Sequence, residues 1–269
     1  MENDCDAVDI NLGCPQGIAK KGNYGSFLLD KKDLIVSMVK KLKAELAVPV
    51  TCKIRLLHNE KDTLDLAMAI QEAGASLLTV HGRCKEHNKH RVGSANYDMI
   101  KKIKQHLSIP VIVNGGISTF DDVERAIEMT GCDGAMSSEA ILEYPALFDP
   151  SKIYDMDEIM LEYIDLFQQY PGEGDLKTLR SHMFKFLYTG LSKHTDIRDV
   201  LNKAKGFEPI KEVAVLMKER RKNETVDEKI GWYYRHWRGM GLDRETTNTF
   251  SEEIWAEKCI KDPLLNKAL

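Results

Sequence analysis

A cysteine stands directly after the first short apolar run of the chain, in the sequence Asn11-Leu12-Gly13-Cys14-Pro15-Gln16. An ordinary thiol has a pKa of about 8.5 and is protonated at neutral pH, which suits a proton donor better than a resting nucleophile. A proline and several glycines follow it, as in a loop that lets a side chain meet a substrate. Cys14 is therefore the candidate catalytic residue. A buried structural cysteine is the alternative, and it is the commoner fate of this residue type.

Cations recur where the next two apolar runs end. Lys53 and Arg55 are alternate residues of one run, so their side chains point the same way. Two buried cations there need an anion or a polar ligand to offset their desolvation. His81-Gly82-Arg83 repeats the pattern in the following run, although a histidine that is satisfied within the core is the alternative for His81. Together these residues favour a site for a polar or anionic ligand.

Glycines and serines follow the last two runs. One run ends in Asn114-Gly115-Gly116, and the other spans Gly134 to Ser138, with Ser137 and Ser138 at its end. Backbone N–H groups and helix N-termini at such positions bind phosphate in many barrel enzymes. With the cations nearby, the pattern indicates a planar cofactor that carries a phosphate. Flavin mononucleotide (FMN) is the candidate, because lysine or histidine beside its ring stabilises the anionic reduced form.

Alternating strands and helices must position these residues. Strands are predicted at 7–12, 48–55, 77–82, 110–116 and 133–138, and helices at 33–46, 63–73, 97–107 and 119–129. Strands joined through helices pair in parallel, so the pattern predicts an α/β fold. Polar residues end successive runs, as at the top face of a (β/α)₈ TIM barrel, and no G-x-G-x-x-G marks a doubly wound sheet. Residues 17–25 are expected to form a glycine-rich, basic loop.

The strand signal ends at Pro150. Helices are predicted at 153–169, 176–191, 197–205 and 207–222, so the chain divides into a partial barrel at 1–150, a small all-helical domain at 151–222, and a tail of open role at 223–269. Between 176 and 222, twelve Lys or Arg residues stand against five Asp or Glu, although the net charge of the chain is −4. A nucleic-acid partner and a solvated helix face both fit this charge. In the tail, residues 232–238 combine aromatic and basic side chains that could stack on bases, although packing on the body is the default.

Cysteine spacing and hydropathy exclude several classes of protein. The six cysteines include no C-x-x-C pair, so neither a zinc site nor a disulfide framework is expected, no metal is predicted, and the cysteines other than Cys14 are interpreted as structural or incidental. No stretch approaches the roughly 18 apolar residues of a membrane span, and the first residues are acidic, unlike a signal peptide. We expect a soluble, monomeric protein with no membrane partner that is cytoplasmic, with the nucleus left open.

In order and spacing, these motifs resemble those of the tRNA-dihydrouridine synthases. The resemblance rests on N-x-G-C-P at Asn11 to Pro15, K-x-R at Lys53 to Arg55, H-G-R at His81 to Arg83, Asn114-Gly115-Gly116, and Met136-Ser137-Ser138-Glu139 ahead of Pro145 to Phe148. It spans about residues 5–222 and is closest to the eukaryotic branch that reduces D-loop uridines 16 and 17. The combination is specific, where each motif alone is weak.

The resemblance implies a flavin-dependent oxidoreductase that acts on tRNA. In the family, a flavin reduced by NADPH delivers hydride to C6 of a uracil and a cysteine protonates C5, which gives 5,6-dihydrouridine. By motif, Cys14 is the acid, and the substrate contacts are Asn11, Arg55 and Arg83. The flavin contacts are Lys53 and His81 at the ring, and Asn114, Gly115, Gly116, Ser137 and Ser138 at the ribityl phosphate. The helical domain is implied to grip tRNA while a flipped uridine enters the site.

The chain also departs from the family. In the family, the N-x-G-C-P segment follows the fourth strand of the barrel, whereas in this sequence it follows the first predicted strand. Only five strands are therefore predicted, although eight are needed to close a TIM barrel. We therefore expect an N-terminally truncated TIM barrel whose activity and flavin affinity depend on the missing units. Two other classes stay open. One is a non-catalytic RNA-binding fragment without FMN, and the other is a phosphate-binding aldolase or decarboxylase, which needs a Schiff-base lysine or an acid pair but no N-x-G-C-P loop.

Overall fold

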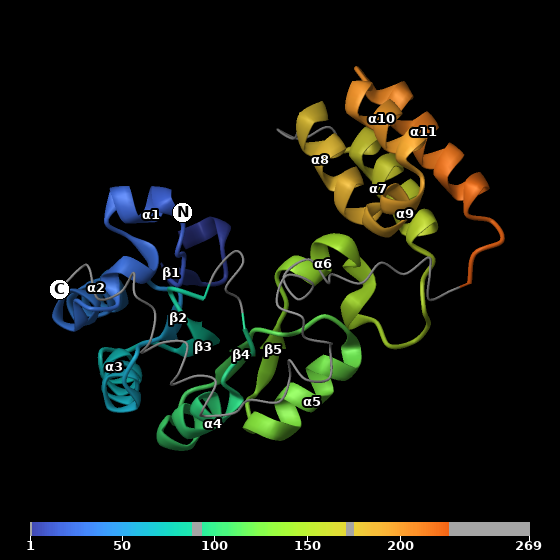
Figure 1. Ribbon diagram of the computed structural model, residues 1–269. Helices are drawn as coiled ribbons and strands as arrows, with labels where there is room; N and C mark the ends of the chain where they lie inside the picture. Colours follow the sequence, from blue (N-terminus) through green and yellow to red (C-terminus); the bar gives the residue numbers. More distant parts are fainter. Residues whose placement is uncertain (1, 88–92, 171–174, 226–269) are drawn as a thin grey trace, which may run out of the picture. The chain divides into compact units, whose positions relative to one another are not determined.

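The chain divides into two compact units, each of which is described by itself. The structure is a computed structural model that describes residues 2–87, 93–170 and 175–225 (Figure 1). The first unit holds the described part of residues 1–117 together with 121–136, and the second holds 118–120 together with the described part of 137–233. The sheet belongs to the first unit, and helices build most of the second.

A five-stranded parallel sheet forms the first unit. Its strands are β1 (Val8–Leu12), β2 (Val50–Leu56), β3 (Leu77–Cys84), β4 (Val111–Asn114) and β5 (Gly134–Met136), and they lie side by side in chain order. The predicted α/β class is confirmed. No strand among the described residues is inserted out of order, so the sheet has no switch point of the doubly wound kind in this part of the chain.

Helices connect the consecutive strands. They are α2 (Lys32–Glu45), α3 (Glu60–Glu72), α4 (Tyr97–His106) and α5 (Phe120–Thr130), close to the predicted ranges. Two of them begin where an asparagine caps free backbone N–H groups: the Asn59 side chain accepts from Lys61 and Asp62, and Asn96 accepts from Met99. Their apolar faces cover the sheet, because residues such as Leu66 and Ile100 are fully buried against it.

Some local expectations were wrong. Residues 17–25, expected to be a loop, begin with helix α1 (Gly17–Gly22) and lead into the 3-10 turn η2 (Gly25–Leu28). The helix ends at Asn23, whose left-handed backbone (φ 53°) lets its N–H reach the carbonyls of Ala19 and Lys20. The fourth strand was also predicted too long, since Gly115 and Gly116 both have positive φ and end β4 at Asn114. The fifth strand, predicted at 133–138, covers only Gly134–Met136, because Ser138 is already the N-cap residue of helix α6 (Glu139–Glu143).

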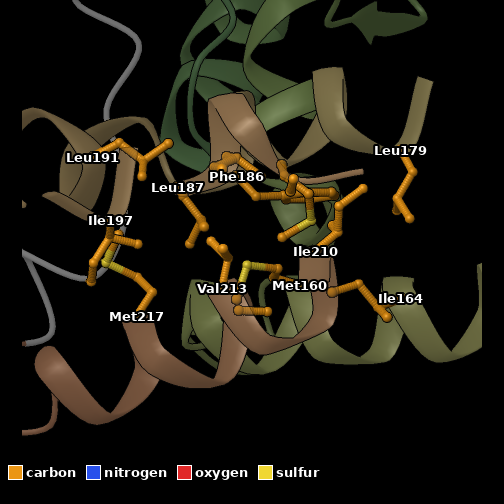
Figure 2. Packing of buried hydrophobic residues seen from close by; sticks show 14 of the residues in the cluster. Met160, Ile164, Leu179, Phe186, Leu187, Leu191, Ile197, Ile210, Val213 and Met217 are labelled. Carbon is orange, nitrogen blue, oxygen red and sulfur yellow. The ribbon is translucent and has the colours of Figure 1, made fainter. Parts of the chain in front are cut away.

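Helices fill the second unit after β5. They are α6 (Glu139–Glu143), α7 (Met156–Gln169), α8 (Leu176–Phe186), α9 (Tyr188–Lys193), α10 (Thr195–Lys203) and α11 (Phe207–Arg220), with a 3-10 turn, η3 (Pro145–Phe148), between α6 and α7. A further 3-10 turn, η1 (Glu2–Asp4), lies before β1 in the first unit. The single helix predicted at 176–191 is two helices, which break at the fully buried Leu187 (φ −94°, ψ 11°). Buried side chains from α7 to α11 and the turns between them pack into one apolar core (Figure 2), whose labelled members are Met160, Ile164, Leu179, Phe186, Leu187, Leu191, Ile197, Ile210, Val213 and Met217.

The basic segment of the second unit is only partly available to a partner. Arg221 is buried, and its guanidinium bonds the equally buried Asp157 at 3.1 Å and Glu224 at 2.7 Å. Exposed cations remain, for example Lys177, Arg198 and Lys203. No helix in the described ranges is long and apolar enough to cross a membrane. The aromatic and basic cluster at 232–238, with the rest of the tail from 226, lies outside the described residues.

Candidate active site

The register of the sheet brings the predicted residues together. Asn11 on β1 lies beside Lys53 on β2, Arg55 lies beside His81 on β3, and His81 lies beside Asn114 on β4. Neighbouring strands are about 4.8 Å apart, so these side chains emerge at one edge formed by the carboxyl ends of the strands. The candidate site in the first unit is therefore one surface rather than scattered positions.

The turn that carries Cys14 is fixed from both sides. The Asn11 Oδ1 atom accepts from the backbone N–H groups of Gly13 at 3.1 Å and Cys14 at 3.2 Å. The Cys14 carbonyl in turn accepts from the Ser26 backbone and side chain, each at 3.0 Å. Gly25 closes this contact with φ 64°, and a Cβ there would lie 2.6 Å from the Cys14 oxygen. Cys14 is partly exposed, whereas Cys52, Cys84 and Cys132 are buried.

Arg55 ties the Cys14 turn to the end of the third strand. Its Nε donates to the Gly13 carbonyl at 2.8 Å, and its Nη1 donates to the carbonyls of Cys84 at 3.0 Å and His87 at 3.3 Å. The side chain is buried, so these carbonyls supply the acceptors that its charge requires. Among the described residues its Nη2 group makes no such bond, which leaves its two N–H donors for a ligand.

Lys53 is held by Asn114. The lysine ammonium donates to the Asn114 Oδ1 atom at 3.0 Å, and the Asn114 amide donates to the Met136 carbonyl at 2.8 Å. Burial, helped by the charge of Arg55 and opposed by that of Asp9, lowers the pKa of Lys53 to about 8. Both ends of the Asn114 amide are thus used within the protein, and Lys53 is a cation whose charge depends on pH near neutrality.

His81 is a neutral imidazole with an assignable tautomer. Burial, with the charges of Arg55, Arg83 and Lys53, lowers its pKa well below the ordinary range. The Arg83 Nη1 atom lies 3.2 Å from His81 Nε2. A guanidinium can only donate, so Nε2 accepts and the ring proton lies on Nδ1. Arg83 itself is buried and also donates to the Gly93 carbonyl at 2.9 Å, which orients it toward the histidine.

A glycine turn follows β4 and packs against His81. Gly115 and Gly116 have φ values of 111° and 76°, and a Cβ on Gly115 would lie 2.9 Å from His81 Cδ2. The turn is held by the buried Tyr97, whose hydroxyl donates to the Gly115 carbonyl at 2.7 Å. Sequence reasoning missed Tyr97, because an aromatic residue at the start of an amphipathic helix is typical of an ordinary core position.

Ser137 and Ser138 belong to the second unit and are described with it. Ser137 follows β5 directly, and Ser138 is the N-cap residue of α6, where its side chain makes no capping hydrogen bond. Their predicted phosphate contact therefore stays a prediction.

The donor set of the first unit fits a planar, anionic ligand. It offers the Lys53 ammonium, a neutral imidazole and a side-chain-free glycine turn, with a partly exposed thiol on the neighbouring turn. None of these groups is a carboxylate, so the set does not suit a hard metal ion. It matches the ring and phosphate chemistry of FMN.

Comparison with known proteins gives one consistent relationship. A family model described as dihydrouridine synthase (Dus) matches residues 1–230. The tRNA-dihydrouridine(16/17) synthase [NAD(P)(+)] of Schizosaccharomyces pombe is 40% identical over 230 residues, covering 80% of this chain and 58% of that protein. A similarly named protein of Mus musculus is 40% identical over 227 residues (84% and 47%), and the tRNA-dihydrouridine(16) synthase of Yersinia pestis is 32% identical over 215 residues (77% and 69%). The chain spans about half the length of the eukaryotic relatives it matches.

Proposed function

The chain belongs to the dihydrouridine synthase (Dus) family, and from this premise we propose that it reduces uridine in the D-loop of tRNA to 5,6-dihydrouridine. The cofactor is FMN and the hydride donor is NADPH. The observation that carries the proposal is the partly exposed Cys14 on a turn braced by Asn11 and Arg55, beside the Lys53 and His81 pair.

The sheet is, in this proposal, five of the eight strands of a TIM barrel. Parallel strands in uninterrupted chain order support it. Barrel enzymes place catalytic residues at the carboxyl ends of their strands, and the Cys14 turn, Arg55, His81 and Asn114 occupy that edge. A barrel completed by three further βα units would enclose this edge and exclude water from it.

The residues that would hold FMN are those of β2 to β4. Lys53 and the Nδ1–H of His81 would donate to the ring, and the backbone of Gly115 and Gly116 would approach the phosphate. The assignment of Ser137 and Ser138 to the phosphate rests on their motif alone. When bound and reduced, FMN supplies the hydride that is added to C6 of the uracil.

Cys14 supplies the proton. Its S–H gives H⁺ to C5 of the uracil as C6 gains hydride, and the thiolate that remains recovers a proton from water. The Arg55 guanidinium donates to the carbonyl of the neighbouring Gly13 at 2.8 Å, which keeps a cation on the Cys14 turn. The Asn11 oxygen is occupied by the turn, so Asn11 offers only its amide N–H₂ to a uracil carbonyl, and Arg55 offers Nη2.

Binding of tRNA is assigned to the helical region at 151–222. A single uridine flipped out of the D-loop supplies little binding energy. The affinity for tRNA must therefore come from protein contacts with phosphates elsewhere in the tRNA. Exposed cations on α8 and α10, such as Lys177, Arg198 and Lys203, can make them, whereas the buried Arg221 cannot. A cytoplasmic monomer, with the nucleus left open, completes the proposal.

Reconstitution with FMN tests the proposal against its alternative, an RNA-binding fragment without flavin. The purified chain is mixed with FMN, dialysed and scanned for flavin absorbance, and binding of unmodified tRNA is measured in parallel. We expect a yellow protein that also binds tRNA, with FMN held more weakly than a complete eight-stranded barrel would hold it. A colourless protein that binds tRNA equally well would support the alternative instead.

A further inference from the structure

Three metal-ligating side chains meet beside the candidate site and take no part in it. His58, Cys84 and Glu86 each offer one ligand atom, and these atoms all lie within 4.8 Å of one another. His58 Nε2 and Glu86 Oε1 are 3.3 Å apart. Cys84 is buried at the end of β3, whereas His58 follows β2 and its side chain is 46% exposed.

An irregularity in the sheet creates this cluster. The register of β2 and β3 shifts between Arg55 and Leu56, so that Leu56 pairs with Cys84 instead of the residue after His81. The shift brings the residues after β2 over the end of β3, and the Cys84 thiol lies 3.6 Å from the Leu57 carbonyl. Two loops of different strands therefore converge on one point.

The distances suit a tetrahedral ion. With Zn–N and Zn–O bonds of about 2.0–2.2 Å and a Zn–S bond of about 2.3 Å, the edges of a tetrahedron are about 3.3–3.7 Å long. The His58–Glu86 distance already has this length, and the other separations need to close by about an ångström at most, which a rotation of exposed side chains can supply.

The donor types select the metal. One thiolate, one imidazole and one carboxylate form a mixed S, N, O set that favours Zn²⁺ over Mg²⁺ or Ca²⁺, which prefer oxygen alone. The second carboxylate oxygen of Glu86 is buried and has no hydrogen-bond partner in the described structure, so the carboxylate is incompletely satisfied by His58. Thiolate and carboxylate together also neutralise a divalent ion beside the Arg55 guanidinium.

We propose that His58, Cys84 and Glu86 bind a zinc ion that clamps the ends of β2 and β3, with a fourth position left for water. The clamp would fix the Cys84 carbonyl, to which Arg55 donates at 3.0 Å, and so would hold Arg55 against the Cys14 turn. Binding of the ion would require neither FMN nor tRNA. Cysteine spacing could not reveal it, because the three ligands come from two loops and form no short motif.

Zinc titration of the purified chain tests the site, with calorimetry for stoichiometry and Co²⁺ substitution for a thiolate absorption band. We expect one equivalent of Zn²⁺ to bind and to raise the thermal midpoint. The variants His58→Gln and Glu86→Gln change exposed or half-buried side chains and should weaken binding at least tenfold, and Cys84→Ser should abolish the cobalt–thiolate band.

Cys5→Ser is the matched control, because Cys5 is an exposed thiol that does not belong to the cluster, and this variant should bind Zn²⁺ as the parent chain does. Equal zinc affinity in the parent, His58→Gln and Glu86→Gln proteins, or no stoichiometric binding by the parent, would overturn the proposal. FMN content, measured on the same samples, reports separately on the proposed catalytic function.

Discussion

At the scale of the residue, the polar side chains of the site are held first by the protein itself. Asn11 accepts from the Cys14 turn, Arg55 donates to three backbone carbonyls, and Asn114 joins Lys53 to β5. Each therefore positions a neighbour and keeps only part of its capacity for a ligand. Substitutions at these residues will change the geometry of the site as well as its contacts, so their effects on rate and on stability should be measured together.

The lowered pKa of Lys53 predicts a pH-dependent stability. Since the folded chain holds the Lys53 proton less tightly than the unfolded chain, unfolding takes up a proton between the folded pKa of about 8 and the ordinary value of 10.5. The free energy of unfolding should therefore increase as pH rises from about 8 to 10, because the unfavourable burial of the Lys53 charge is relieved.

Lys53→Met should remove that gain and make the cofactor-free chain more stable at pH 7 by about 1–3 kcal/mol. Urea unfolding of both proteins at pH 7, 8.5 and 10 measures the difference. Parallel pH profiles for the two proteins would contradict the assigned shift.

A substitution at Gly25 tests whether the reaction requires the exact position of the Cys14 turn. In Gly25→Ala, the left-handed backbone is strained by about 1–2 kcal/mol and the new methyl group meets the Cys14 carbonyl, which must move. Dihydrouridine formation should fall about 100-fold, since displacement by an ångström can cost that much. Gly17→Ala is the control, because nothing lies within 4 Å of a Cβ there, and it should keep the parent rate. Equal loss in both variants would show that the turn is not specifically placed.

At the scale of the element, single side-chain contacts hold helices in place within each unit. Helix α4 holds the glycine turn after β4 by the hydroxyl of Tyr97, and α11 is joined to α7 by the buried pair of Arg221 and Asp157. Both contacts are side-chain bonds between elements, so each can be removed without altering a helix.

Tyr97→Phe should loosen the glycine turn. The change leaves the Gly115 carbonyl without this donor in a buried position, at a cost of about 1–2 kcal/mol in the free energy of unfolding. FMN affinity should fall about tenfold, as fluorescence quenching of the flavin can show. Tyr170→Phe, at a residue that is 68% exposed, serves as control. Unchanged FMN affinity in Tyr97→Phe would remove the turn from the cofactor site.

The buried ion pair between Arg221 and Asp157 contributes to the free energy of unfolding of the helical unit. Arg221→Met takes the cation away from a buried carboxylate and should destabilise this unit by about 3–5 kcal/mol. The double variant Asp157→Leu with Arg221→Met should recover most of the loss, since it also removes the carboxylate. Thermal unfolding by circular dichroism compares the three proteins. A double variant no more stable than the single one would contradict this account.

At the scale of the whole molecule, the sequence predicts the elements that periodicity determines. All five strands and the helices between them follow from alternating patterns, and the strand-end motifs, carried by Lys53, Arg55, His81 and Asn114, lie at one edge of the sheet, where the candidate site is proposed. Two features could not be predicted from local propensity. The break between α8 and α9 occurs at Leu187, which is buried by packing, and the helix at Gly17–Gly22 is ended by the left-handed cap at Asn23.

Contacts between elements distant in sequence could not be predicted. Tyr97 reaches Gly115, and His58 meets Cys84 only through a register shift, so neither pair leaves a motif in the chain. Arg83 and Asn114 were assigned to ligands, yet their bonds to His81 and Lys53 give them a positioning role that residue type alone does not reveal. Whether either also touches a ligand stays a prediction.

The central claim is that Cys14 protonates uridine in a flavin site at the strand ends. Unmodified tRNA is incubated with FMN, NADPH and either the parent chain, Cys14→Ala or the control Cys5→Ala, and dihydrouridine is measured by mass spectrometry of the digested tRNA. Loss of a general acid slows a reaction by about 10²–10⁴-fold, so Cys14→Ala should make almost no dihydrouridine, while Cys5→Ala matches the parent. Equal rates in Cys14→Ala and the parent, or no product from the parent, would contradict the account.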